Sequence, residues 1–163
     1  MHDPRRLFVW GTGLTEGIEW AFWMSAIVWW VIDLNLSPFE LVLMGTVLEG
    51  CVLLFETPTG VVADLQSRRR SLVIAQVIMA VAFFWSIASH NFWVILPAQA
   101  LFGIGWTFRS GADVAWVTDE LKGRGLAGED EIDLILLERH KLGIASGIAF
   151  VGLAALFGTL FSV

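Results

Sequence analysis

The fold of this chain is decided by the stretch Glu56-Thr57-Pro58-Thr59-Gly60-Val61-Val62-Ala63-Asp64-Leu65-Gln66-Ser67-Arg68-Arg69-Arg70-Ser71-Leu72. A long apolar run ends here with a carboxylate, three arginines follow, and a new apolar run begins. This pattern predicts a helix that leaves a membrane, a tight turn at a basic surface, and a second helix that enters the membrane again. The turn therefore indicates which side of the membrane each segment faces.

The composition places the whole chain in the membrane class. Of its 163 residues, 56% are hydrophobic and 16% are charged, against about 25% charged residues in an average soluble domain. Soluble-enzyme classes are excluded because the sequence has no Ser/His/Asp constellation, no glycine-rich phosphate loop after a strand and no metal-ligand spacing. The single cysteine, Cys51, cannot form a disulfide framework. We expect no enzyme activity, no cofactor and no nucleic-acid partner.

Segment lengths predict an all-α, polytopic membrane helix bundle. A membrane-spanning helix needs roughly 20 mainly apolar residues. Five segments meet this requirement, and we predict a single transmembrane domain over residues 1–163 with these spans: 7–32, 38–63, 71–89, 92–117 and 142–163. The stretch 118–141 is then a polar loop, and its part from residue 129 onward is predicted to form a short helix at the membrane surface that leads into the fifth span.

The positions of the basic residues predict the orientation. With the N-terminus in the cytoplasm, the inner segments are 1–6, 64–70 and 118–141. These segments hold every Lys and Arg of the chain except Arg109, as the positive-inside rule requires. The prediction is therefore an integral protein of a bacterial plasma (inner) membrane, with membrane lipids as partners and the C-terminus outside.

Short motifs predict how the helices begin and pack. Ser37 followed by Pro38 and by Glu40 is a capping-box opening for the second span. The tight turn at Asn91 requires the third and fourth spans to be antiparallel neighbours. Gly143 and Gly147 form a small-xxx-small pair, which is typical of a face that packs closely against another helix.

The candidate functional residues are the ionisable side chains inside the spans, because a charge there is costly. They are Glu16, Glu19, Glu49, Glu56, Arg109 and Asp113. A rise of 1.5 Å per residue places Glu16, Glu56 and Arg109 at one level, roughly 10–14 Å from the inner surface. Spacing of four residues predicts one shared helix face for Arg109 and Asp113, and spacing of seven does so for Glu49 and Glu56.

Such a layer has two interpretations. We expect Arg109 to be ion-paired and one carboxylate to hold a proton near neutral pH. The functional interpretation is a polar cavity that binds a cation or relays a proton, with Glu19 contacting the substrate. The structural interpretation is an ion-pair network that joins helices. The mid-span tryptophans also have two interpretations. They line a pocket for a flat apolar or cationic ligand, or they face lipid and pack in the core; these residues are Trp20, Trp23 and Trp106.

The opening stretch resembles the loop between the second and third helices of the major facilitator superfamily. Its matching residues are Gly60, Ala63, Asp64, Arg68, Arg69 and Leu72. The stretch from Phe108 to Leu121 is similar to the fourth-helix region of bacterial members. The resemblance implies a rocker-switch transporter with two six-helix halves. It also implies a cytoplasmic latch in which Gly60, Asp64, Arg68 and Arg69 act with Asp119, and a central-cavity or proton-coupling role for Arg109.

The sequence departs from the family pattern in three places. Leu65 replaces the usual Arg, Ser67 replaces the second Gly, and the fifth span lacks the Gly-Pro pair of drug–proton antiporters. Five spans are also fewer than the six of one half. We therefore expect the N-terminal part of a secondary transporter that exports small amphipathic molecules. It would work with missing helices, copies of itself or a partner. The alternative is a truncated, transporter-derived structural or accessory subunit of a larger membrane complex.

Overall fold

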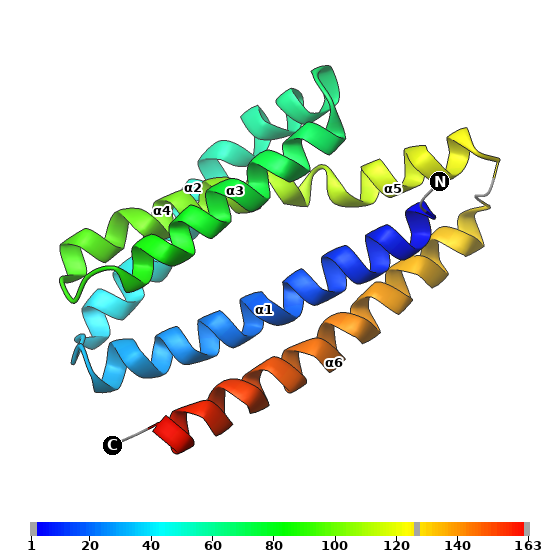
Figure 1. Ribbon diagram of the computed structural model, residues 1–163. Helices are drawn as coiled ribbons and strands as arrows, with labels where there is room; N and C mark the ends of the chain where they lie inside the picture. The colour runs from blue at the N-terminus through cyan, green and yellow to red at the C-terminus, as the bar shows by residue number, and fades with distance from the viewer. Residues whose placement is uncertain (1–2, 126–127, 162–163) are drawn as a thin grey trace. The chain divides into compact units, whose positions relative to one another are not determined.

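The chain is mostly helical in the parts that the computed structural model describes, residues 3–125 and 128–161 (Figure 1). No strand occurs in these two ranges, so the all-α prediction is confirmed. The helices, in chain order, are α1 (Pro4–Ile32), α2 (Pro38–Leu65), α3 (Arg68–Ile87), α4 (Phe92–Ser110), α5 (Asp113–Gly123) and α6 (Glu129–Phe161).

Three of these helices are long and apolar enough to cross a membrane. They are α2, α3 and the part of α6 from Glu131 to Thr159. This agrees with membrane insertion at three of the five predicted spans. The other two, in α1 and α4, are also helical but are not among the three helices that meet this requirement; α1 contains Glu16 and Glu19, and α4 contains Gln99 and Arg109. Their insertion stays a prediction.

The chain divides into two compact units, each of which is described by itself. One consists of Met1–Trp30 with Val117–Val163, and therefore contains most of α1, the end of α5, and α6. The other is Val31–Trp116, which contains α2, α3, α4 and the start of α5. The prediction of one transmembrane domain concerns how both units lie in a bilayer, and it stays a prediction.

Local chemistry determines where the helices of the second unit begin. The Ser37 side chain accepts a hydrogen bond from the Glu40 backbone N–H, while the Glu40 carboxylate accepts one from the Ser37 backbone N–H at 2.7 Å. This is the predicted capping box, with Pro38 at the first helical position. Asn91 caps α4 by accepting a hydrogen bond from the Trp93 N–H at 2.9 Å.

Helix α4 is the centre of the second unit. It packs against both α2 and α3, which contact each other much less, and α3 and α4 are the neighbours that the Asn91 turn predicts. Two glycines of α4 allow this close packing. A Cβ atom at Gly103 would lie 2.6 Å from the Leu48 carbonyl oxygen of α2, and one at Gly105 would lie 2.7 Å from the Met79 side chain of α3.

Two predicted boundaries were wrong. The segment 92–117 is two helices, because α4 ends at Ser110 and α5 begins at Asp113. Gly111 lies at the break, and the Asp113 carboxylate accepts a hydrogen bond from the Val114 N–H at 2.6 Å. Glycine and aspartate both disfavour a helix interior. In addition, the expected surface helix and the fifth span form a single helix, α6, with no break between residues 129 and 161.

Candidate functional site

The candidate site lies where α1 and α6 pack side by side in the first unit (Figure 1). Small residues permit this approach. A Cβ atom at Gly13 would lie 3.0 Å from the Leu142 side chain, and one at Gly17 would lie 2.7 Å from the Ser146 carbonyl carbon. Because both pairs advance by four residues in the same sense, α1 and α6 run parallel. Helix α1 contains the first predicted span and α6 contains the fifth, and two odd-numbered spans of one membrane bundle must run in the same direction.

The predicted glycine face of α6 contacts α1 of the same chain. A Cβ atom at Gly143 would lie 2.6 Å from the Glu16 carboxylate, and one at Gly147 would lie 3.5 Å from the Trp20 Cβ. Ser146, between the two glycines, donates a hydrogen bond to the Gly13 carbonyl oxygen at 2.8 Å. The glycines and the serine therefore hold the two helices together and bring a carboxylate of α1 onto the backbone of α6.

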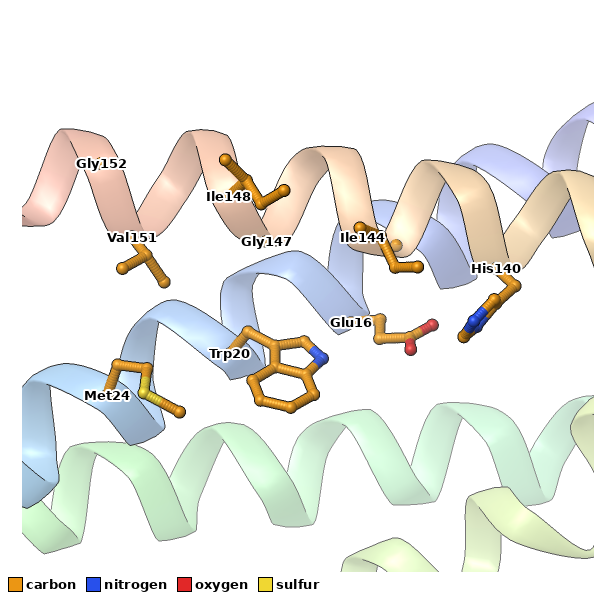
Figure 2. A pocket seen from close by; sticks show the side chains of 10 residues that line it. Glu16, Trp20, Met24, His140, Ile144, Gly147, Ile148, Val151 and Gly152 are labelled. Atoms are coloured by element: carbon orange, nitrogen blue, oxygen red, sulfur yellow. The ribbon is translucent and has the colours of Figure 1, made fainter.

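A groove of about 550 Å³ follows this helix pair (Figure 2). In the figure, Glu16 and His140 lie at one end, Trp20 lies in the middle, and Met24 and Val151 lie toward the other end. The two helices contribute the walls together. The lining residues are Glu16, Trp20, Met24, His140, Gly143, Ile144, Gly147, Ile148, Val151 and Gly152.

Glu16 is the acidic group of the groove, and its surroundings are mostly apolar. Its side chain is 26% exposed, and its Oε2 lies 3.8 Å from Nε of Arg139 on α6. The same Oε2 is buried and accepts no hydrogen bond from any residue that the structure describes. The Arg139 guanidinium also lies 5.7 Å from the centre of the Phe8 ring. An anionic oxygen with one distant cation retains capacity for a further positive group.

A second ion pair joins the same two helices nearer their N-terminal ends. Arg5 donates a hydrogen bond to the Glu138 carboxylate at 2.6 Å, and both side chains are partly exposed. This hydrogen bond and the charge of Glu138 raise the pKa of the Arg5 guanidinium, so Arg5 stays charged at physiological pH. Consecutive residues of α6 thus form ion pairs of opposite polarity with α1: Glu138 supplies the anion of one pair, and Arg139 supplies the cation of the other.

The predicted charge layer is divided between the two units. Glu16 and buried Glu19 belong to the first unit. Glu49 and Glu56 are both exposed on α2, and Arg109 and Asp113 are both buried at the end of α4 and the start of α5. The single layer, with Arg109 paired to a carboxylate, therefore stays a prediction.

The helix that was predicted to carry Arg109 and Asp113 on one face is not continuous, so their shared face stays a prediction. The four-residue spacing places two residues on one face only if the helix between them is continuous. Here α4 ends at Ser110, so Arg109 closes one helix and Asp113 opens the next. The Arg109 guanidinium lies 4.4 Å from the centre of the Trp106 ring, one turn earlier in α4, which is a cation–π geometry.

The latch residues at the α2–α3 turn are partly assembled within the second unit. The Asp64 carboxylate lies 3.3 Å from Arg68, and the Arg68 guanidinium also donates a hydrogen bond to the Ala115 carbonyl oxygen at 3.1 Å. A Cβ atom at Gly111 would lie 3.8 Å from the Gly60 Cα, so Gly60 faces the junction between α4 and α5.

The remaining latch residues are exposed. Arg69 projects from the first turn of α3, and Asp119 lies on the part of α5 that belongs to the first unit. Pairing of Asp119 with the turn stays a prediction.

Sequence reasoning missed Arg139 and His140 as members of the site. Arg139 was assigned only to the polar loop that precedes the fifth span. A signal was present, since Arg139 is four residues before Gly143 and therefore lies on the glycine face of a continuous helix. The expected break between the loop and the span concealed it.

Comparison with protein-family models, curated proteins and solved structures finds no match to this chain. The resemblance to the major facilitator superfamily therefore depends on the residues of the α2–α3 turn and of the α4–α5 region alone.

Proposed function

We propose that this chain is a membrane transport protein, the N-terminal part of a secondary transporter of the major facilitator type, and that the α1–α6 groove binds a small amphipathic cation. One observation carries the proposal. The Glu16 carboxylate lies in an apolar groove, beside a helix long enough to cross a membrane, with a buried oxygen that accepts no hydrogen bond within the described residues.

The chemistry of the groove favours a cation with an apolar body. A carboxylate held in apolar surroundings attracts a positive group more strongly than one in water, because the local dielectric constant is low. The Trp20 side chain is 51% exposed next to it and offers a ring face for cation–π contact. Apart from His140 at the Glu16 end, the remaining lining is aliphatic or glycine, which suits the apolar part of the ligand.

Arg139 has a defined place in this proposal. It is the residue of α6 that forms an ion pair with Glu16, and it competes with a bound cation for the same carboxylate. Ligand binding then breaks or weakens the Glu16–Arg139 pair, which connects α1 to α6. A ligand-sensitive ion pair between two helices is a means of coupling binding to helix movement.

Transport by alternating access needs two facing halves. The proposed transporter therefore assembles with a second set of helices, supplied by another copy or by a partner. In the accessory-subunit alternative, the glycine face of α6 would meet an unrelated protein. Because α1 occupies that face, the glycine face gives no support to the alternative.

The binding test uses tetraphenylphosphonium, a lipophilic cation, with the purified chain in mild detergent and equilibrium dialysis. Glu16→Gln should weaken binding at least about fivefold, because a unit charge about 4 Å away contributes about 1 kcal/mol or more. Arg139→Gln should strengthen binding, since it removes the competing cation. The matched control is Glu120→Gln, which removes a carboxylate of α5 that pairs with Arg124 in the turn after the helix, and it should leave binding unchanged.

The essential result is that Glu16→Gln lowers the affinity for the cation and Arg139→Gln raises it. Equal loss in Glu16→Gln and Glu120→Gln would mean that only net charge matters, and the groove would not be the site. The mass and composition of the detergent particle supply the second measurement. Stable co-purification with unrelated membrane proteins, together with no cation binding, would instead support the accessory-subunit alternative.

A further inference from the structure

A second groove, of about 510 Å³, lies on α3 just after the α2–α3 turn. Its lining residues are Ser67, Arg69, Arg70, Val73 and Ile74. Each arginine is followed four residues later by an exposed aliphatic side chain, Val73 after Arg69 and Ile74 after Arg70. The groove therefore has a cationic end at the start of the helix and an apolar floor one turn further along.

The three arginines of the turn differ in what they contact. Arg68 pairs with Asp64 and with the Ala115 carbonyl oxygen, so it stabilises the turn itself. Arg69 and Arg70 are exposed, and neither guanidinium forms an ion pair or hydrogen bond within residues 3–125 and 128–161. Two adjacent cations at the end of an apolar helix thus remain available to an anion from outside the chain.

The apolar floor continues along one face of α3. Val73, Val77 and Val81 follow Arg69 at intervals of four residues and are 59%, 58% and 49% exposed. From Arg69 to Val81 this face is about 18 Å long at 1.5 Å per residue. One leaflet of a bilayer contributes about 15 Å of hydrocarbon, half of a core of about 30 Å. The strip therefore matches the length of one acyl chain.

We propose that this face of α3 binds an anionic phospholipid, with the phosphate between Arg69 and Arg70 and an acyl chain along the valine strip. Charge complementarity selects an anionic headgroup, and the valines select a lipid over a free anion. The end of α3 that carries the arginines is predicted to face the cytoplasm, where anionic lipids are attracted to basic clusters. The proposal rests on membrane insertion of α3 and does not depend on transport.

The experiment measures energy transfer from the tryptophans of the purified chain, in detergent micelles, to dansyl-labelled phosphatidylglycerol or dansyl-labelled phosphatidylcholine. The wild-type chain should bind the anionic lipid more tightly. Arg69→Gln with Arg70→Gln should weaken its binding about 25-fold, a factor of about five for each basic side chain, and should leave phosphatidylcholine binding unaffected. Lys122→Gln with Arg124→Gln is the matched control, because it removes the same charge from the end of α5 and the turn that follows it, and should preserve the preference.

Three results would overturn the proposal. They are equal binding of the two lipids by the wild-type chain, equal loss in both double variants, and displacement of the lipid by an excess of inorganic phosphate. If the Arg69/Arg70 variant does not fold, the test is to cross-link a photoactivatable phosphatidylglycerol to the wild-type chain and to map the labelled peptides. Cross-links to the α3 peptide 67–81 support the site, and cross-links distributed over the other helices refute it.

Discussion

Ser146 shows how one polar side chain can join two apolar helices. Its hydroxyl is buried and donates to the Gly13 carbonyl oxygen of α1 at 2.8 Å, while it also lies 3.1 Å from the Gly143 carbonyl oxygen of its own helix. A hydroxyl that is buried in this way needs a partner, and the second carbonyl gives it an alternative within α6. Its contribution to the α1–α6 contact is therefore modest.

Ser146→Ala tests this estimate at the residue scale. Loss of the hydrogen bond to Gly13 should lower the free energy of unfolding by about 0.5–1 kcal/mol, the range for interhelical hydrogen bonds in membranes. The measurement is the unfolding midpoint in mixed micelles as denaturing detergent increases. Ser25→Ala is the control, because Ser25 is exposed on α1; an equal effect of both variants would show that helix propensity alone is responsible.

At the element scale, the α1–α6 pair depends on glycines that have different roles on the same helix. Gly17 lies against the backbone of Ser146, whereas a Cβ atom at Gly11 would meet nothing within 4 Å. The two positions have the same residue type and the same helical conformation. They therefore separate interhelical packing from the intrinsic cost of glycine in a helix.

Gly17→Ala should force α1 and α6 apart and lower the free energy of unfolding by about 1–3 kcal/mol, the usual cost of overpacking. Gly11→Ala should instead raise it by up to about 1 kcal/mol, since alanine is the better helix former. Thermal unfolding followed by circular dichroism measures both. A change in the free energy of unfolding with the same sign for both variants would contradict the packing seen between α1 and α6.

At the scale of the whole molecule, the topology connects the basic turn at Ser67 with the opposite turn at Asn91 through α3. Helix α3, Arg68–Ile87, is 20 residues long and apolar enough to cross a membrane. If it does so, Ser67 and Asn91 lie on opposite sides of the bilayer. The positive-inside rule then places Ser67 on the cytoplasmic side.

Single cysteines at these two positions test the topology. In a Cys51→Ser background, Ser67→Cys should be protected from a membrane-impermeant thiol reagent added to whole cells, and Asn91→Cys should react. Permeabilised cells should label at both positions, which is the control for accessibility. Labelling of both positions in whole cells would refute the predicted path of α3.

Composition, segment length and short motifs were enough to predict the helical class, the membrane character of three helices and the start of α2. The Ser37 capping box and the tight turn at Asn91 could be predicted because they depend on residues within four positions of each other. Composition and segment length do not depend on any long-range contact either. Local interactions and transfer of apolar side chains out of water are enough to specify these features.

Which helices contact each other, and where the helices end, became clear from the three-dimensional structure. The break at Gly111 was missed because the span was assigned by its apolar length, although Gly111 and Asp113 both disfavour a helix interior. The continuity of α6 was missed because the polar residues before the apolar span were assigned to a separate surface helix. The groove and the Glu16–Arg139 pair could not be predicted from spacing, since these residues lie far apart in the chain and meet only through the parallel packing of α1 on α6. Hydrophobic pattern assigns a residue to a helix face, but the shape of small residues such as Gly17 and Gly143 determines which other helix that face accepts.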